Sequence, residues 1–113
     1  PHADKLAAES VRLENFYVSP SCSPTRAALL TGMHEFRSGV THTREPRMRL
    51  HKDAVTLPEL LKKSGYRTAL IGKWHLGGSH PFRPQDRGFE EVLIHGGGGV
   101  GKTAAASADV APS

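Results

Sequence analysis

A predicted helix that leads directly into a predicted strand restricts this chain to the α/β class. Thr56, followed three residues later by Glu59, has the pattern of a capping box and predicts a helix that begins there and ends at Gly65. Residues 66–71 are compatible with a strand, and so are residues 91–95. A helix, a turn and a strand in quick succession are typical of a mainly parallel sheet flanked by helices.

The amino-terminal part of the chain predicts another helix, a strand and a second helix. Residues 4–10 are compatible with a short helix, and residues 11–18 show the alternation of a half-buried strand. The next helix should begin at or just after Ser23, because Pro24 is tolerated only in a first turn. Gly32 should end that helix. The loop between a strand and a helix is the usual position of site residues in an α/β sheet.

Cys22, the only cysteine of the chain, lies in that loop. A helix N-terminus leaves backbone N–H groups unpaired and favours negative charge, and Arg26 adds a fixed cation. Cys22 is therefore placed where an anion or a developing negative charge would be stabilised. A small cysteine buried at the start of a core helix fits the same stretch equally well.

A second candidate site follows the strand predicted over residues 66–71, where residues 72–78 are predicted to form a loop. In an extended segment, residues two apart point to the same side. Lys73 and His75 are therefore expected to converge on one small anion. The alternative is a solvent-exposed lysine beside a structural histidine.

Charge and hydropathy narrow the classes of partner. The net charge of +4 and a pI near 9.6 fit an anionic partner and, equally, a solvated basic surface. Residues 33–53 are predicted to be a polar loop, and the basic residues are densest there, at Arg44, Arg47, Arg49 and Lys52. No aromatic residue lies among these four to stack on a base, so nucleic acid is not an expected partner. No apolar run approaches the roughly 18 residues needed to cross a membrane.

Two stretches, in the same order along the chain, resemble the two signatures of the sulfatase family. The first comprises Cys-Ser-Pro-Thr-Arg at residues 22–26 and Leu-Thr-Gly at residues 30–32. The second comprises Gly-Tyr-Arg-Thr at residues 65–68 and Gly-Lys-Trp-His-Leu-Gly at residues 72–77. The presence of both signatures makes the resemblance far more specific than either would be alone.

The resemblance implies a fold class and a domain organisation. The fold would be an incomplete piece of an alkaline-phosphatase-like α/β fold, with a mixed, mainly parallel sheet flanked by helices. Residues 1–101 would form part of a sulfatase catalytic domain, and residues 102–113, rich in alanine and serine, a disordered low-complexity tail. Sulfatases of this kind are usually periplasmic, secreted or lysosomal, so an exported protein is expected.

The resemblance also implies hydrolysis of sulfate esters through formylglycine, which a formylglycine-generating enzyme makes from Cys22 in the unfolded chain. The aldehyde hydrates, and one oxygen attacks the ester sulfur while the alcohol departs. The second hydroxyl then loses its proton, sulfate is expelled and the aldehyde is regenerated. Cys22 would be the nucleophile and, as formylglycine, a ligand of a divalent cation, usually calcium. Arg26 would hold the hydrated aldehyde, and Lys73 would bridge the nucleophile and the substrate sulfate. His75 would bind the second hydroxyl and assist its deprotonation.

The other metal ligands of the family have no counterpart in this sequence. Calcium needs several carboxylate or carbonyl oxygens, and the family's two acidic clusters correspond to positions before residue 1 and after residue 113. No matching position is occupied by the aspartates of the chain, which are Asp4, Asp53, Asp86 and Asp109. The chain is therefore expected to be a sulfatase fragment with little or no hydrolytic activity. The alternative is an inactive fragment that binds anions through Lys73, Arg26 and the basic loop.

A glycine-rich run gives a further alternative from a different functional class. Residues 96–103, Gly-Gly-Gly-Gly-Val-Gly-Lys-Thr, fit the loose pattern of a phosphate-binding loop and follow the strand predicted over residues 91–95. Only ten residues follow Thr103, too few for a later strand that would carry a magnesium ligand. Nucleotide binding is therefore the less favoured alternative.

Overall fold

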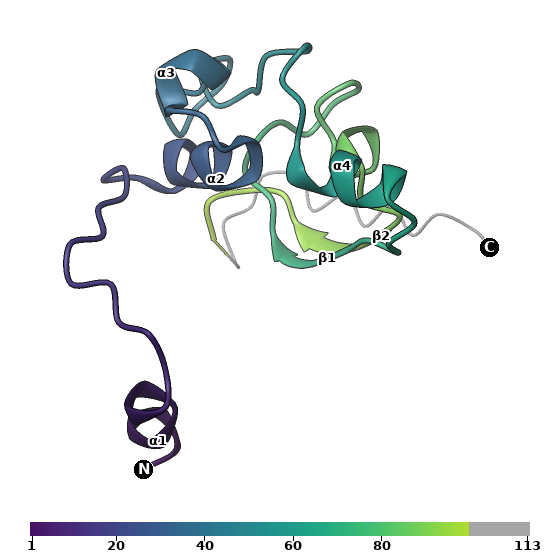
Figure 1. Ribbon diagram of the computed structural model, residues 1–113. Helices are drawn as coiled ribbons and strands as arrows, with labels where there is room; N and C mark the ends of the chain where they lie inside the picture. The colour runs from purple at the N-terminus through teal and green to yellow at the C-terminus, as the bar shows by residue number, and fades with distance from the viewer. Residues whose placement is uncertain (100–113) are drawn as a thin grey trace.

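The computed structural model describes residues 1–99 (Figure 1), and the tail expected over residues 102–113 lies outside this range. The helices, in chain order, are α1 (His2–Ala8), α2 (Cys22–Thr31), α3 (Glu35–Ser38) and α4 (Leu57–Lys63). Strand β1 (Ala69–Lys73) is followed by the short 3-10 helix η1 (Gln85–Arg87) and by strand β2 (Glu91–His95). No helix within residues 1–99 is both long enough and apolar enough to cross a membrane.

Strands β1 and β2 pair in parallel, which confirms the expected α/β class. Ala69 lies opposite Glu91, and Lys73 lies opposite His95, so the two carboxyl ends meet at one edge of the sheet. Strand β2 has the predicted bounds, and α4 begins and ends close to its predicted positions.

Strand β1 begins later than the predicted residue 66, because the residues before it bond to a loop. The Thr68 hydroxyl donates to the Gly88 carbonyl at 2.6 Å. The Thr68 carbonyl accepts hydrogen bonds from the N–H groups of Glu90 and Glu91. These bonds tie Thr68 to the segment that leads into β2, and regular pairing starts only at Ala69.

Helices α2 and α4 lie on the same side of the sheet (Figure 1). On that side the buried apolar core consists of Ala27, Val40, Leu50, Trp74, Leu76 and Phe89. Leu70, Val92 and Ile94 of the strands pack against it. On the opposite face, the side chains of Ile71 and Leu93 are 78% and 70% exposed. The core therefore lies between the helices and one face of the sheet, and it includes residues directly after β1.

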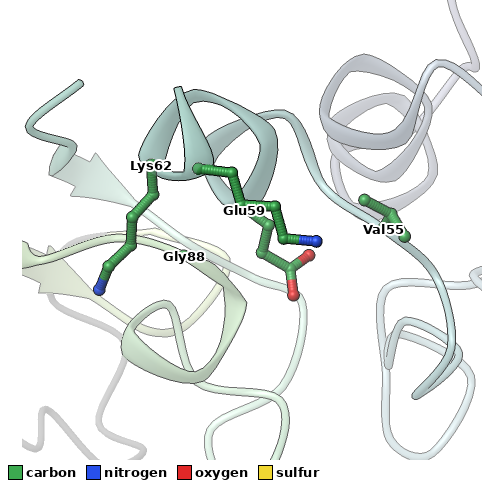
Figure 2. Close-up of a pocket in the computed structure, with 5 residues that line it drawn as sticks. Val55, Glu59, Lys62 and Gly88 are labelled. Carbon is green, nitrogen blue, oxygen red and sulfur yellow. The ribbon is translucent and has the colours of Figure 1, made fainter. Parts of the chain in front are cut away.

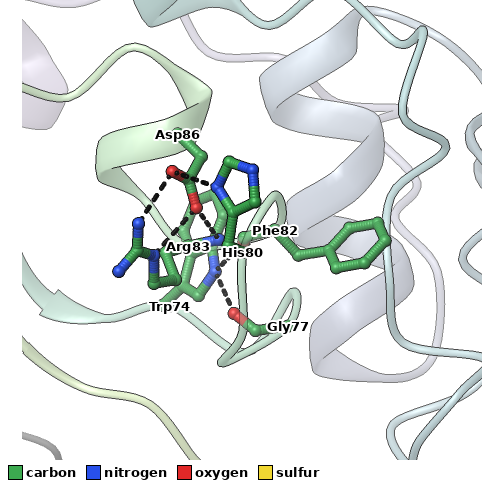
Figure 3. A network of polar contacts seen from close by, with 6 residues as sticks. All are labelled: Trp74, Gly77, His80, Phe82, Arg83 and Asp86. Atoms are coloured by element: carbon green, nitrogen blue, oxygen red, sulfur yellow. Dashed lines mark hydrogen bonds and ion pairs between the residues drawn. The ribbon is translucent and has the colours of Figure 1, made fainter.

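Trp74 fixes the loop that follows β1. Its indole Nε1 donates to the carbonyls of Gly77 and Phe82, each at 2.9 Å, as Figure 3 shows. The indole also meets Phe89 edge to face, with ring centroids 6.1 Å apart. A buried indole N–H needs a partner, and these two carbonyls hold the loop in a defined course.

The strand predicted over residues 11–18 is wrong. These residues have no regular secondary structure, and Val11 and Tyr17 are 89% and 87% exposed. Alternation of side chains predicts a strand only where a sheet edge is available to pair with it. Within residues 1–99, β1 and β2 pair only with each other, and Figure 1 shows the segment running away from them.

Two smaller differences concern helices. Helix α1 covers residues 2–8 rather than 4–10. Helix α3 forms inside the segment predicted to be a loop, with His34 as its N-cap. The His34 Nδ1 accepts a hydrogen bond from the backbone N–H of Phe36 at 3.4 Å. Gly39, with φ of 85°, ends this helix in the left-handed region that glycine adopts at low cost.

The start of α4 is joined to η1 by a buried threonine and a buried arginine. The Thr56 N–H donates to Glu59 Oε2 at 2.7 Å, which completes the predicted capping box. The Thr56 hydroxyl lies 2.8 Å from the Arg87 carbonyl. The guanidinium of Arg87 donates to the carbonyls of Lys52 and Ala54. Residues in three separate segments are thereby held together.

A hollow of about 300 Å³ lies beside α4 and is lined by Val55, Glu59, Lys62, Lys63 and Gly88 (Figure 2). The Glu59 carboxylate is already bonded to Thr56. The Lys62 ammonium lies 3.8 Å from a carboxylate oxygen of Glu90. The hollow therefore belongs to the capping region of α4 and is not the candidate site.

Replacing Thr56 with valine should lower the free energy of unfolding by about 1–2 kcal/mol, because the valine removes a helix cap and leaves a buried carbonyl of Arg87 unpaired. Urea denaturation followed by circular dichroism measures this change. Thr56→Ser retains the hydroxyl and should lose much less. Equal stability of the valine variant and the unmodified chain would contradict the assigned role.

Candidate active site

Helix α2 brings Cys22 to the carboxyl edge of the sheet. Ser21, the N-cap, is extended, and Cys22 is the first helical residue, so the helix begins one residue before the predicted start and includes Cys22. Pro24 lies in the first turn, where its missing N–H costs no hydrogen bond. The Thr25 hydroxyl donates to the Ser19 carbonyl at 2.7 Å and fixes the chain before the helix. Gly32, with φ of 66°, ends the helix as predicted.

Cys22 and His75, 53 positions apart in the chain, are in direct contact. The Cys22 Sγ lies 3.1 Å from the His75 Nδ1. The His75 side chain is almost completely buried, with 6% of the residue exposed. The Ser23 hydroxyl donates to the His75 carbonyl at 2.7 Å. The two stretches that resemble the sulfatase signatures thus meet at these residues.

Residues 72 and 73, predicted to be loop, belong to β1, and the extended conformation expected up to His75 ends at Lys73. Strand β1 ends at Lys73, and His75 has φ of 63°, the left-handed region that few residues other than glycine adopt. This turn directs the imidazole toward α2, whereas Lys73 reaches the glycine run. The Lys73 Nζ donates to the Gly98 carbonyl at 2.9 Å.

Arg26 holds the backbone just before His75. Its Nε donates to the Trp74 carbonyl at 2.8 Å, and its Nη2 donates to the Lys73 carbonyl. Burial lowers the pKa of Arg26, and the nearby Cys22 acts in the opposite direction. An arginine stays protonated in proteins, so the site retains a fixed positive charge beside the thiol.

His75 is held in its neutral form. Burial lowers its pKa most, and the ammonium of Lys73 lowers it further. A backbone hydrogen bond with Thr43 acts in the opposite direction. A neutral imidazole can accept a proton at one ring nitrogen, so His75 is suited to act as a base near neutral pH.

The glycine run after β2 borders the site. An added Cβ at Gly98 would lie 3.5 Å from the His75 Cε1, so the backbone passes close to the imidazole. In a phosphate-binding loop, backbone N–H groups face the ligand, whereas here the Gly98 carbonyl accepts a bond from Lys73. Lys102 and Thr103 of the alternative nucleotide site lie outside the described residues.

The described residues contain no preformed metal site. Within residues 1–99, no three His, Cys, Asp or Glu side chains gather closely enough to hold a metal ion. The Asp86 carboxylate is engaged by Arg83, at 2.9 Å and 3.0 Å, and by His80 at 3.0 Å (Figure 3). The Arg83 guanidinium holds the pKa of Asp86 far below its usual range. The donor set that calcium needs is therefore not found among these residues.

The structure brings together the four residues expected at the site and adds contacts that the sequence did not indicate. The Ser23 hydroxyl contacts His75, and the Gly98 carbonyl contacts Lys73. No spacing rule links these positions to residues 73–75, because the contacts arise between segments far apart in the chain. Only the contact of Ser23 could have been suggested by the sequence, because Ser23 directly follows Cys22.

Comparison with known proteins identifies the family of the chain. The profile of the Sulfatase family matches residues 1–105. Mouse arylsulfatase J is 44% identical over 95 residues, which cover 80% of this chain and 16% of that protein. Human N-acetylgalactosamine-6-sulfatase is 42% identical over 102 residues, which cover 80% of this chain and 20% of that protein. The chain thus spans between a sixth and a fifth of the length of these relatives.

Solved structures support the same assignment. One comes from work on the metabolism of multiple glycosaminoglycans by Bacteroides thetaiotaomicron. It has a TM-score of 0.68 at 32% sequence identity, and the match covers 84% of this chain and 22% of that chain. Another, Ps i-CgsB in complex with k-i-k-neocarrahexaose, has a TM-score of 0.63 at 35% sequence identity. That match covers 70% of this chain and 18% of that chain. These similarities confirm the alkaline-phosphatase-like fold class, of which the two-stranded sheet and its helices form a part. The chain belongs to the sulfatase family.

Proposed function

We propose that this chain supplies the nucleophile-bearing part of a sulfuric ester hydrolase, with formylglycine made from Cys22. The observation that carries the proposal is the contact of 3.1 Å between the Cys22 Sγ and the His75 Nδ1. It joins the two stretches that resemble the family signatures. The names of relatives such as N-acetylgalactosamine-6-sulfatase favour sulfated saccharides as the class of substrate.

The proposed roles are those that the resemblance to the sulfatase family implies, and the positions of the side chains support them. If formed and hydrated, formylglycine would supply one hydroxyl for attack on sulfur and a second hydroxyl whose deprotonation releases sulfate. His75, kept neutral by burial and by Lys73, accepts the proton from the hydroxyl nearest to it. Arg26 supplies a permanent positive charge beside residue 22 and also keeps the segment before His75 in place.

Lys73 is proposed to bind the sulfate oxygens. Its ammonium is bonded to the neutral Gly98 carbonyl, and a sulfate would replace this partner with a charged one. Hydrogen bonds between charged groups are stronger than those to a neutral carbonyl. In a complete site, loss of this group would raise the reaction barrier by roughly 3 kcal/mol.

The calcium site is proposed to depend on residues beyond those described. Residue 22, as formylglycine, would contribute one oxygen ligand. The remaining carboxylate ligands are assigned to parts of the protein other than residues 1–99, because these residues contain no suitable cluster. Residues 1–101 are accordingly proposed to form part of a catalytic domain. Export from the cytoplasm is proposed separately, from the resemblance to the sulfatase family.

An inactive anion-binding fragment is the second candidate function. The observation that favours it is the same lack of a ligand cluster within residues 1–99, combined with the positive charges of Lys73 and Arg26 at the site. Such a fragment would bind sulfate without turning over an ester.

Coexpression with a formylglycine-generating enzyme should convert Cys22, with a loss of about 18 Da in the intact mass. The Cys22→Ala variant should keep its calculated mass under the same conditions. Peptide mapping should place the change at residue 22. An unmodified thiol, in a strain that converts another sulfatase sequence, would contradict the proposal.

Replacing Lys73 with methionine should raise the pKa of His75, because the ammonium that disfavours the imidazolium is lost. Nuclear magnetic resonance titration of the His75 ring protons measures this shift. Sodium sulfate should raise the same pKa in the unmodified chain and have less effect in the variant. Arg67→Met, which removes an exposed cation paired with Glu91, is the matched control. An unchanged His75 pKa in Lys73→Met would contradict the assigned contact.

The lowered pKa of His75 makes the stability of the fold depend on pH. A histidine with a lowered pKa in the folded state stabilises the fold above its unfolded pKa of about 6.5, and this contribution is lost as pH falls through the folded pKa. The unfolding free energy should therefore decrease with acidification below about pH 6.5, and His75→Asn should reduce this dependence. Urea denaturation at a series of pH values gives the comparison. Identical pH profiles for the two proteins would show that His75 does not contribute.

The converted chain, supplied with calcium, should hydrolyse 4-nitrophenyl sulfate no faster than its Cys22→Ala variant. The reason is that residues 1–99 contain no cluster of His, Cys, Asp or Glu side chains that could hold the metal ion. A rate well above that of the variant, and abolished by a chelator, would show that this chain alone completes the metal site.

A further inference from the structure

His95 ends strand β2 at the edge of the sheet where the candidate site lies. It is the residue opposite Lys73 in the parallel pair, and the Trp74 N–H donates to its carbonyl at 3.3 Å. Neighbouring strands lie about 4.8 Å apart, and the side chains of directly opposite residues leave the same face of a sheet. The imidazole of His95 therefore leaves the backbone beside the side chain of Lys73.

The chain turns back toward Lys73 directly after His95. The Lys73 Nζ donates to the Gly98 carbonyl at 2.9 Å, so this end of the turn is held at the site. Gly96 and Gly97, in between, have no side chains, and an added Cβ at either would meet no atom within 4 Å. The turn therefore leaves open space beside the sheet edge, and His95 brings the one polar side chain of residues 95–98 to it.

The Nδ1 of the His95 ring is buried and has no hydrogen-bond partner within residues 1–99. A buried polar atom nearly always has a partner, because leaving it unpaired costs free energy. Two arginine nitrogens, in Arg49 and Arg87, are also buried without a partner in this part of the chain. Arg49 forms an ion pair with Glu45, however, and Arg87 donates to carbonyls through its other nitrogens. The unpaired atom of His95 is therefore the one that needs a further explanation.

A tetrahedral oxyanion held by Lys73 would give this nitrogen a partner. In the proposed function, the Lys73 ammonium exchanges the Gly98 carbonyl for an oxygen of sulfate. A neutral imidazole carries a proton on one ring nitrogen, and that N–H can donate to an anionic oxygen. Hydrogen bonds to charged acceptors are stronger than those to neutral ones. Sulfate offers several oxygens, so one anion can accept hydrogen bonds from Lys73 and from His95 together.

We propose that His95 is a further anion-binding residue of this site, whose Nδ1–H donates to an oxygen of the sulfate that Lys73 binds. The inference rests on the proposed function, because it takes Lys73 as the residue that binds sulfate. It accounts for the unpaired buried nitrogen, and for the position of His95 opposite Lys73 at the carboxyl edge of the sheet.

The test uses the 113-residue chain with nitrogen-15 in its histidine rings, and adds sodium sulfate at constant ionic strength. Sulfate should shift the Nδ1 resonance of His95 as well as the ring resonances of His75, and Lys73→Met should strongly reduce both shifts. His95→Leu should bind sulfate about tenfold more weakly, as read from the His75 resonances, because a hydrogen bond to a charged group is lost. His95→Asn, whose amide N–H can donate from nearly the same place as Nδ1, should retain most of the affinity.

The matched control is His2→Leu, which removes an exposed histidine of α1 and should bind sulfate as the unmodified chain does. Equal losses of affinity in His95→Leu and in the control would overturn the inference. A shift at His75 without one at His95, or a sulfate-bound His95 whose Nδ1 carries no proton, would overturn the inference and leave the proposed function intact. If sulfate shifts neither histidine, the proposed sulfate site fails, and the role of His95 fails with it.

Discussion

Three consecutive backbone carbonyls, beginning with that of the last residue of β1, are held by side chains from the first turns of α2. Arg26 bonds the carbonyls of Lys73 and Trp74, and Ser23 bonds the carbonyl of His75. A strand that ends inside a protein leaves carbonyl groups that need partners, and here one helix supplies them. The left-handed turn at His75, the contact of its ring with Cys22 and the direction of Lys73 all depend on this arrangement.

Local signals in the sequence predicted the elements that need no distant partner. The proline in the first turn of α2, the glycine after it and the capping box at Thr56 act within a few residues, and the structure agrees with each of them. Alternation over residues 11–18 depends on a neighbouring strand, which the described residues do not provide, so that prediction failed. The start of β1 likewise moved because the hydroxyl and carbonyl of Thr68 bond to the loop before β2.

The residues of the site could be predicted by resemblance, but their geometry could not. Two separate signatures identified Cys22, Arg26, Lys73 and His75, and the fold brings them into one place. Simple strand geometry placed Lys73 and His75 on the same side, whereas the chain turns between them. That turn is stabilised by residues about fifty positions earlier in the chain, which no local pattern can indicate.

The burial of the residues around Cys22 has a consequence for the order of events in the cell. Ser23 is fully buried, Pro24 is also buried, and Arg26 is bonded to two carbonyls. If Cys22 is converted to formylglycine as proposed, an enzyme that reads this segment as an open peptide would compete with the docking of α2 onto the end of β1. The fraction of converted molecules would then be set by the ratio of two rates, that of modification and that of folding. A substitution that only accelerates docking would lower the yield of converted chain without altering any group at the site.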